Sequence, residues 1–341
     1  MSMTYRRKAE WSRRRFLNAA ALAGTGAALG LPAGPALAEP PPEVTTIRWV
    51  RSPAICVAPY YVAEGLLRAE GFTDVRPYKT EGNTWTQDVL AGNVDLVLNF
   101  VGPLLLRLDA GDPLVVLGGV HVGCFELFVT ERVHAVRDLK GKTVSVPALG
   151  DAQHVFLASI VANVGLDPRK DINWVIHPRA EAMQLLAEEK IDAFLGFPPE
   201  PQALRAKGVG HVVVNSTVDR PWSQYFCCMA YTRRDFAQKY PIATKRALRA
   251  ILKAADVCAA EPDRTARFLV DQGYTASYDL ARQAMRETPY GKWREYDHED
   301  SVRFYALRLR EAGMIKSSPQ KIIAEGTDWR FLRELRRELK A

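Results

Sequence analysis

The sequence predicts an α/β protein of two lobes, with two crossover strands between them and a helical C-terminal part. Strand-like and helix-like segments alternate along residues 46–197, which is the pattern of repeated βαβ units. The segments 95–111 and 192–208 match at their main positions with an offset of 97 residues, about the size of one lobe. Beyond Asp235 the pattern is almost wholly helical.

The first predicted lobe alternates short apolar runs with helical stretches. Its predicted strands are 46–50, 74–78, 95–100 and 114–117, and its predicted helices are 60–69, 83–91 and 104–109. Asn83 is expected to cap the second of these helices, because its short side chain accepts a hydrogen bond from a free amide of the first turn. Strands that alternate with helices imply a parallel sheet, since parallel strands need crossover connections.

The second predicted lobe repeats this order. Its strands are 142–146, 172–176 and 192–197, and its helices are 152–164 and 180–188. Asp95, Leu98, Phe100 and Gly111 of the first lobe correspond to Asp192, Leu195, Phe197 and Gly208 of the second. We therefore expect two lobes of related topology.

Two apolar, strand-like segments, 125–130 and 225–231, are interpreted as the crossovers between the lobes. They set the predicted boundaries: a linker at 39–43, lobe one at 44–124 plus 228–341, and lobe two at 125–227. Helices are predicted in the C-terminal part at 243–260, 262–272, 278–287, 298–312 and 329–339.

Residues 1–38 have the three zones of a secretory signal. Residues 5–15 are basic, residues 16–33 are apolar and uncharged, and Ala36-Leu37-Ala38 is the small-x-small pattern that a signal peptidase cuts after Ala38. A membrane anchor is disfavoured, because the apolar zone is rich in Ala and Gly and shorter than the ~20 strongly apolar residues of a span. No Cys follows the cut, which disfavours a lipoprotein. We expect a periplasmic mature protein.

The basic zone also indicates the export pathway. Residues 12–17 (Ser-Arg-Arg-Arg-Phe-Leu) resemble the twin-arginine motif, which a translocase reads as an address. An ordinary Sec signal with a basic start is the alternative.

Removing the signal changes the charge of the protein. The first 38 residues hold six basic residues and one acidic residue, so the net charge falls from +7 to +2. The high isoelectric point thus belongs partly to the signal. Because no basic cluster marks one face of the remaining chain, a nucleic-acid partner is not expected.

Four short motifs carry a resemblance to a known family. They are Leu-Ala-Gly-Asn-Val-Asp at 90–95 with Ala-Gly-Asp-Pro at 110–113, Asp-Leu-Lys-Gly-Lys-Thr-Val at 138–144, Gly-Leu-Asp-Pro at 165–168 with Asp-Ile at 171–172, and Phe236 with Tyr240-Pro241. In this order they resemble the nitrate/sulfonate/taurine (SsuA/TauA-like) and NMT1/THI5-like solute receptors. The resemblance covers about residues 45–260.

The resemblance implies a type II periplasmic-binding-protein fold and a function in transport. Such proteins bind a small solute between two lobes, close around it by a hinge motion and present it to an ABC importer. The implied partners are a small organic solute, the permease and ATPase of that importer, and the twin-arginine translocase during export. A monomer without catalytic activity and without a cofactor is expected. A periplasmic ligand sensor is an alternative.

A second alternative is an enzyme on the same fold. The THI5-like pyrimidine synthases share the resemblance and carry a cysteine-rich iron site, but this chain has only Cys227-Cys228 where a cysteine run appears. The sequence contains no nucleophile elbow, no HExxH and no phosphate loop. The remaining histidines are interpreted as structural or solvated: His134, His177, His211 and His298.

Ligands of open α/β sheets bind beyond the carboxyl ends of the strands, and this rule selects the candidate site. We expect the ligand-binding residues to be Cys56, Tyr60, Asn83, Trp85, Asn99, Phe100, His121, Cys124, Gln153, His154, Phe197 and Glu200. The aromatic residues could stack on a flat organic solute or could pack in the core. Asn99, Gln153 and His154 offer hydrogen bonds.

The loop before the helix at 152–164 leads into a helix N-terminus, which favours an anion. Asp151 stands at this turn. We interpret it as the helix cap, which would compete with an anionic solute such as a sulfonate or nitrate.

Three separate segments bring sulfur towards the predicted cleft: Cys56, then Cys124 with His121 close by, then the Cys227-Cys228 pair. Thiolate and imidazole suit Zn or Cu(I), but neighbouring residues of a strand point to opposite faces, so the pair cannot both face the cleft. We interpret most cysteines as small buried apolar residues and assign no metal site. A disulfide between Cys56 or Cys124 and the return strand is an alternative to metal binding.

Overall fold

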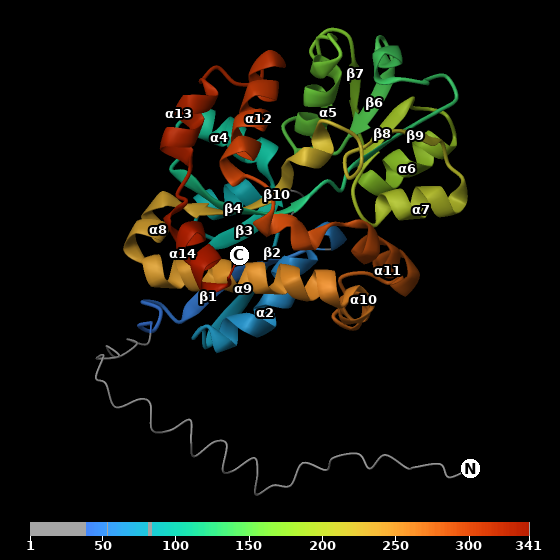
Figure 1. Ribbon diagram of the computed structural model, residues 1–341. Helices are drawn as coiled ribbons and strands as arrows, with labels where there is room; N and C mark the ends of the chain where they lie inside the picture. Colours follow the sequence, from blue (N-terminus) through green and yellow to red (C-terminus); the bar gives the residue numbers. More distant parts are fainter. Residues whose placement is uncertain (1–38, 53, 81–83, 341) are drawn as a thin grey trace, which may run out of the picture. The chain divides into compact units, whose positions relative to one another are not determined.

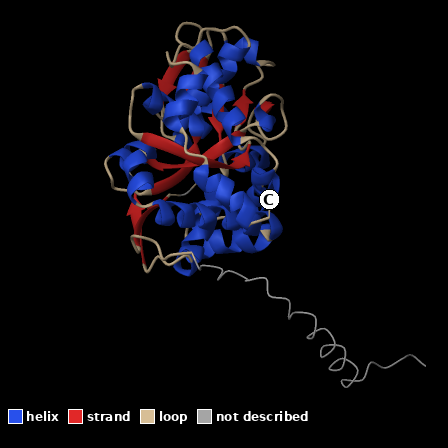
Figure 2. Ribbon diagram, turned by 60° about the vertical axis from the view of Figure 1, so that its left-hand side comes forward, coloured by secondary structure: helices blue, strands red, loops and turns tan. Residues whose placement is uncertain are grey.

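The computed structural model describes residues 39–52, 54–80 and 84–340. Residues 41–340 form one compact unit, the second of the two into which the chain divides. The predicted signal, with its cleavage after Ala38, lies outside the described residues. The second unit holds two sheet-containing lobes, and Figure 2 shows their strands enclosed by helices.

Lobe one contains a pair of strands and a three-stranded sheet. β1 (Thr46–Arg51) and β2 (Asp74–Lys79) are parallel, and the order of the second sheet is β3-β10-β4. Its strands are β3 (Leu96–Phe100), β4 (Leu114–Val122) and β10 (Phe226–Arg233), and the helices of this part are α2 (Ala58–Ala69), α3 (Trp85–Leu90) and α4 (Val101–Asp109). β4 extends five residues beyond its predicted end, so that it reaches the start of the crossover.

Lobe two contains a five-stranded sheet of order β7-β6-β8-β5-β9. Its strands are β5 (Glu126–Val129), β6 (Thr143–Val146), β7 (Asn173–Ile176), β8 (Ala193–Gly196) and β9 (His211–Asn215). Its helices are α5 (Ala152–Asn163), α6 (Arg179–Ala187) and α7 (Glu200–Lys207). The sequence predicted neither α7, which is short and mostly polar, nor β9, which is only five residues long.

The predicted parallel pairing is found in part of each lobe, whereas the crossover strands pair antiparallel. β6 is parallel to β7 and β8, but β5 is antiparallel to β8 and β9. β10 is likewise antiparallel to both β3 and β4. The reason is that each crossover strand lies between two strands of a sheet. It runs in the opposite direction to these neighbours, which belong to the helix-connected part of the lobe.

The C-terminal helices contact both lobes. They are α8 (Arg234–Lys239), α9 (Pro241–Ala260), α10 (Pro262–Asp271), α11 (Tyr278–Glu287), α12 (His298–Glu311), α13 (Pro319–Gly326) and α14 (Arg330–Glu338). α9 packs on α2, α11 lies against α7, and α12 lies between α4 and α5, as Figure 1 shows. None of the described helices combines the length and apolarity needed to cross a bilayer.

The matched aspartates of the two lobes make matched contacts. Asp95 Oδ2 accepts a hydrogen bond from the backbone N–H of Arg48 at 2.7 Å, and the carboxylate pairs with the Arg48 guanidinium. Asp192 Oδ2 accepts from the backbone N–H of Thr143 at 2.9 Å and pairs with Arg132. Each carboxylate thus joins the start of one strand to a neighbouring strand, which explains why both lobes carry Asp at this point.

One predicted cap is wrong. The N-cap of α3 is Thr84, and Asn83, which lies outside the described residues, precedes it. Thr84 Oγ1 donates to Asp88 Oδ2 at 2.9 Å, so the first turn of α3 is bridged by side chains. Asn83 is therefore not the residue that begins the helix.

We predict that Asp95→Ala lowers the free energy of unfolding by about 2 kcal/mol, because it removes a buried carboxylate and leaves the backbone N–H of Arg48 without its charged acceptor. The measurement is urea unfolding followed by circular dichroism. The control is Asp74→Ala, which removes a carboxylate paired with the exposed Arg76 and should cost less than about 1 kcal/mol. Equal losses in the two variants would contradict the assigned role of Asp95.

Candidate functional site

A cavity of about 390 Å³ lies where the two lobes meet. Seven of the predicted ligand residues line it: Cys56, Trp85, Asn99, Phe100, Cys124, Gln153 and Phe197. They come from the ends of β3, β4 and β8, from the start of α3 and α5, and from the 3₁₀ turn Ile55–Val57. The carboxyl-end rule therefore places the cavity correctly, while contact with a solute stays a prediction.

Tyr60 is a correction, because it belongs to the core and does not line the cavity. Its ring stacks on Trp49 with centroids 3.9 Å apart. Its hydroxyl donates to the carbonyl of Leu96 at 2.8 Å and accepts from the backbone N–H of Val50 at 2.9 Å. Both ends of the side chain are thus used in joining α2 to the strands β1 and β3.

His154 and Glu200 lie beside the cavity rather than in its lining. His154 Nδ1 accepts from the backbone N–H of Gly150 at 3.0 Å, and its ring meets the edge of Trp174. Glu200 accepts from the backbone N–H of Phe197 at 3.0 Å and pairs with Arg179 at 2.9 Å. Burial raises the pKa of the Glu200 carboxyl, and the charge of Arg179 only partly offsets this effect. Their hydrogen bonds hold the loops that carry the lining residues.

The predicted ligand residues do not include the other twelve lining residues, among them Arg51, Lys79, Phe125, Arg179 and Cys228. Arg51 and Lys79 are the last residues of β1 and β2, so the carboxyl-end rule could have found them. Cys228 had been recognised on the return strand, but its facing could not be decided. Phe125 and Arg179 carry no sequence signal of their own.

Aromatic rings join the lobes at the back of the cavity. Phe100 of β3 contacts Phe125, Phe156 of α5 and Tyr305 of α12, with ring centroids between 5.2 and 5.4 Å apart. Phe125 meets Phe197 at 5.8 Å. Phe100 is 2% exposed, so it is both a core residue and a wall of the cavity.

The N-terminus of α5 borders the cavity and carries two buried polar groups, Gln153 in the lining and Asp151 behind it, each with an atom left unpaired among the described residues. Asp151 caps the helix, as predicted, with Oδ1 accepting from the backbone N–H of His154 at 2.8 Å. No described residue pairs with Asp151 Oδ2 or with Gln153 Nε2, although both atoms are buried. Burial raises the pKa of Asp151 to about 6, against the lowering effect of the backbone N–H groups.

Sulfur atoms gather at the base of the cavity. The Sγ atoms of Cys124 and Cys227 are 3.4 Å apart, and those of Cys227 and Cys228 are 4.0 Å apart. Adjacent residues approach in this way because the pairing of β10 with β4 shifts register on either side of Cys228. The expectation that only one of the pair lines the cleft holds, since Cys228 lines it and Cys227 does not, but both thiols belong to one cluster.

The pKa values of the thiols in this cluster are shifted in different directions. Burial raises the pKa of the Cys124 thiol well above its ordinary value. Burial alone would do the same at Cys228, but hydrogen bonds from neighbouring thiols and the nearby His121 bring its pKa well below the ordinary value. Cys228 is therefore the sulfur most easily held as a thiolate.

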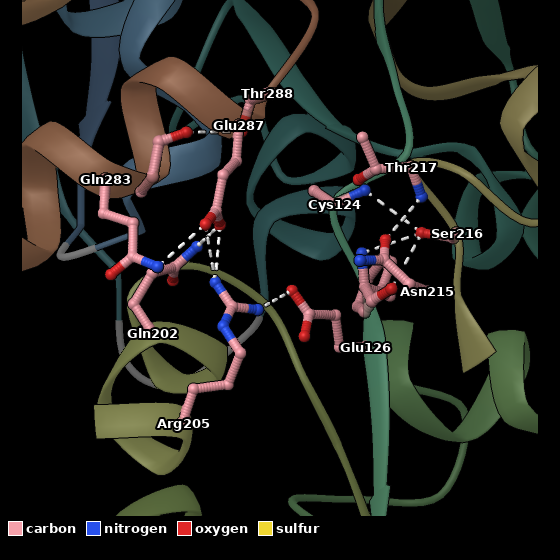
Figure 3. A network of polar contacts seen from close by, with 12 residues as sticks. Cys124, Glu126, Gln202, Arg205, Asn215, Ser216, Thr217, Gln283, Glu287 and Thr288 are labelled. Carbon is pink, nitrogen blue, oxygen red and sulfur yellow. Dashed lines mark hydrogen bonds and ion pairs between the residues drawn. The ribbon is translucent and has the colours of Figure 1, made fainter. Parts of the chain in front are cut away.

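A polar seam links α7 and β5 of lobe two to the end of α11 (Figure 3). Arg205 of α7 pairs with Glu126 of β5 and with Glu287 at the end of α11, the latter at 2.6 Å. Gln202 donates to the same Glu287 carboxylate at 2.8 Å. A second link is the hydrogen bond from the backbone N–H of Ile55 to the carbonyl of Pro198 at 3.2 Å.

We predict that the Asp151 carboxyl contributes stability that is lost as the pH rises from about 4 to 6, and that Asp151→Asn removes this contribution. The raised pKa means that the folded protein keeps a proton that the unfolded chain has lost, so this contribution is present below pH 4 and disappears as the pH passes 6. The expected difference is about 2 to 3 kcal/mol. Melting temperatures of both proteins at pH 4 and pH 7 test it, and parallel changes in the two proteins would contradict it.

Solved structures that share this fold include three binding proteins. The periplasmic nitrate-binding protein NrtA from Synechocystis PCC 6803 has a TM-score of 0.74 at 17% identity, covering 88% of this chain and 90% of that chain. The alkanesulfonate-binding protein SsuA from Xanthomonas axonopodis pv. citri, bound to MOPS, has a TM-score of 0.70 at 17% identity, covering 86% of this chain and 99% of that chain. The periplasmic aliphatic sulphonate-binding protein SsuA from Escherichia coli has a TM-score of 0.61 at 17% identity, covering 79% of this chain and 86% of that chain.

At these identities the likeness shows the fold, which is the periplasmic-binding-protein fold that the sequence motifs implied. No curated protein matches the chain. The NMT1-like family matches residues 40–270, well over half of the sequence, and this range includes all three described sheets and the whole lining of the cavity. The chain belongs to the NMT1-like family.

Proposed function

We propose that the mature chain is an extracytoplasmic solute-binding protein that captures a small organic solute between its lobes and delivers it to an ABC importer. The observation that carries this proposal is the cavity between the lobes, which has apolar aromatic walls and a few converging polar groups. The nitrate-binding and sulfonate-binding proteins that share the fold support the same function. We propose capture without chemical conversion of the solute.

The cavity favours a small organic anion with an apolar body. A volume of about 390 Å³ admits a molecule of modest size. Trp85, Phe100 and Phe197 offer ring faces and edges for the apolar body. Among the lining residues that the structure describes there are three basic side chains and no carboxylate. Asp151 stands behind the lining, where it caps α5, so it competes less with an anion than its sequence position suggested.

Closure around the solute is proposed to involve the polar seam. The crossovers β5 and β10 connect the lobes covalently, while Arg205 joins lobe two to the end of α11 without a covalent link. A hinge motion that opens the cavity would separate these charges and expose the Phe100–Phe156 contact to water. Solute that fills the cavity would add contacts to both lobes and so favour the closed form further.

The location and partners follow from the predicted signal. We propose export into the periplasm, with cleavage after Ala38 and the twin-arginine translocase as the export machinery. The closed monomer would then meet the permease and ATPase of its importer. The Sec pathway stays the alternative for export.

A thermal-shift screen of residues 39–341 tests the proposal, with small carboxylates, sulfonates, amines and pyrimidines as probes. A specific solute at 100 times its Kd should add about 2.7 kcal/mol to the stability. Each mixture is also examined for products by mass spectrometry. If no class stabilises the protein and one class is converted, the chain is an enzyme and the proposal is wrong.

We predict that Gln153→Ala weakens binding of the solute found in this screen about tenfold, because one hydrogen bond from Nε2 is lost. Isothermal calorimetry measures the Kd. Gln184→Ala is the control, since this glutamine lies on α6 and bonds to the exposed Glu188. Equal affinities of the Gln153 variant and the native protein would remove Gln153 from the site.

We predict that Arg205→Ala also weakens binding about tenfold, by loosening closure rather than by removing a contact to the solute. Small-angle X-ray scattering should then show less compaction on addition of solute. The double variant Arg205→Ala with Glu126→Gln should behave like Arg205→Ala alone. It controls for the charge of the buried Glu126 carboxylate, which the single variant leaves unpaired. Arg303→Ala, which breaks a pair within α12, should change neither reading. Full compaction of the Arg205 variants would contradict a role in closure.

A further inference from the structure

We infer that four side chains at the base of the cavity form a binding site for one thiophilic cation of the Zn²⁺ or Cu⁺ class: Cys56, His121, Cys124 and Cys228. One ligand atom from each residue lies within 4.8 Å of all the others. Around a tetrahedral zinc ion with Zn–S bonds of about 2.3 Å, sulfur atoms lie about 3.8 Å apart. The group is thus near the size of a coordination shell and needs an inward shift of about an ångström at most.

The four donors come from three separate segments and do not form a cysteine run. Cys56 lies in the turn Ile55–Val57, His121 is near the end of β4, Cys124 follows that strand, and Cys228 is on β10. Cys228 is the residue that pairs with His121 in the register of β10 and β4. The tertiary fold of lobe one, with β10 paired to β4, therefore assembles the group, and no short motif contains it.

His121 gives an observation that is independent of the sulfur atoms. It is fully buried, and its Nδ1–H donates to the carbonyl of Gly123 at 3.1 Å. This bond leaves Nε2 as the second ring nitrogen, and no described residue pairs with it. A buried polar atom without a partner is costly, whereas a histidine that donates one N–H to a carbonyl is oriented to bind a metal through the other nitrogen.

The cluster differs from ordinary packing of cysteine in a core. Cys258 shows that ordinary case, as a fully buried thiol on α9 away from the other four. The four-residue group instead combines three thiols and an imidazole. Soft sulfur and nitrogen donors select Zn²⁺ or Cu⁺, while Mg²⁺ and Ca²⁺ need oxygen ligands. This inference replaces the sequence-based assignment of no metal.

Oxidation competes with this site. The Cys124 and Cys227 sulfur atoms are 3.4 Å apart, and a disulfide between them would remove one ligand. The site therefore belongs to the reduced protein. It does not depend on the proposed capture of a solute, because cation binding is measured with no solute present.

The experiment uses reduced residues 39–341 under nitrogen, stripped of metal and then titrated. Zn²⁺ is followed by calorimetry, Cu⁺ by transfer from a coloured chelator, and Co²⁺ by its thiolate charge-transfer absorption. We expect one equivalent of Zn²⁺ or Cu⁺ and a cobalt spectrum typical of sulfur ligands. The Zn²⁺ and Cu⁺ titrations show which of the two ions the site prefers. Retention of iron alone, or binding of neither ion by protein whose thiols are free, overturns the inference.

Variants locate the site. His121→Ala and Cys56→Ser should each weaken binding of the ion at least 100-fold, whereas Cys258→Ala should leave it unchanged. Circular dichroism confirms folding, and Cys56→Ser, in a turn at the cavity surface, serves if His121→Ala does not fold. Native affinity in Cys56→Ser overturns the inference. So does a folded protein in which a Cys124–Cys227 disulfide resists reduction and prevents binding.

Discussion

The site depends on one constraint, which is that β10 pairs with β3 along one edge and with β4 along the other. This crossover strand lies between β3 and β4, and its register places Cys228 beside Phe100 on one side and beside His121 on the other. The strand is buried almost throughout, so its amides must be satisfied by these two neighbours. A slip of one residue would turn every one of its side chains to the other face. The wall and the base of the cavity are thus positioned by the same backbone hydrogen bonds.

The cavity lies between lobes that contact each other at some points and stand apart at others. Aromatic rings from β3, α5 and α12 meet at its back, and the Arg205 seam joins its side. Basic residues stand near its mouth and sulfur atoms at its base. An organic anion and a thiophilic cation would therefore occupy different depths of the same space, with an acidic group outward and soft donors inward. This arrangement gives the proposed capture and the inferred metal site distinct chemistry.

Most helices and strands could be predicted from the sequence to within a few residues, because their apolar periodicity is strong and their ends carry Gly, Pro or Asp. α11 was predicted at its observed limits. The alternation also suggested parallel sheets, since it says nothing of strands that return from another lobe. Among the candidate site residues, Phe100 and Gln153 line the cavity, whereas Tyr60 is held in the core by its hydroxyl. Periodicity could not separate these cases, because all three follow a strand or begin a helix.

By itself the sequence determined the two-lobed α/β order, the likeness to solute receptors, the capping role of Asp151 and the loops in which a ligand should lie. These features depend on local composition and on short motifs. Only the tertiary structure decided which side chains of those loops face inward, that Arg51, Lys79 and Arg179 stand in the lining, and that four soft donors meet. Such decisions rest on strand register and on contacts between residues more than 60 positions apart, as from Cys56 to His121, which no local pattern encodes.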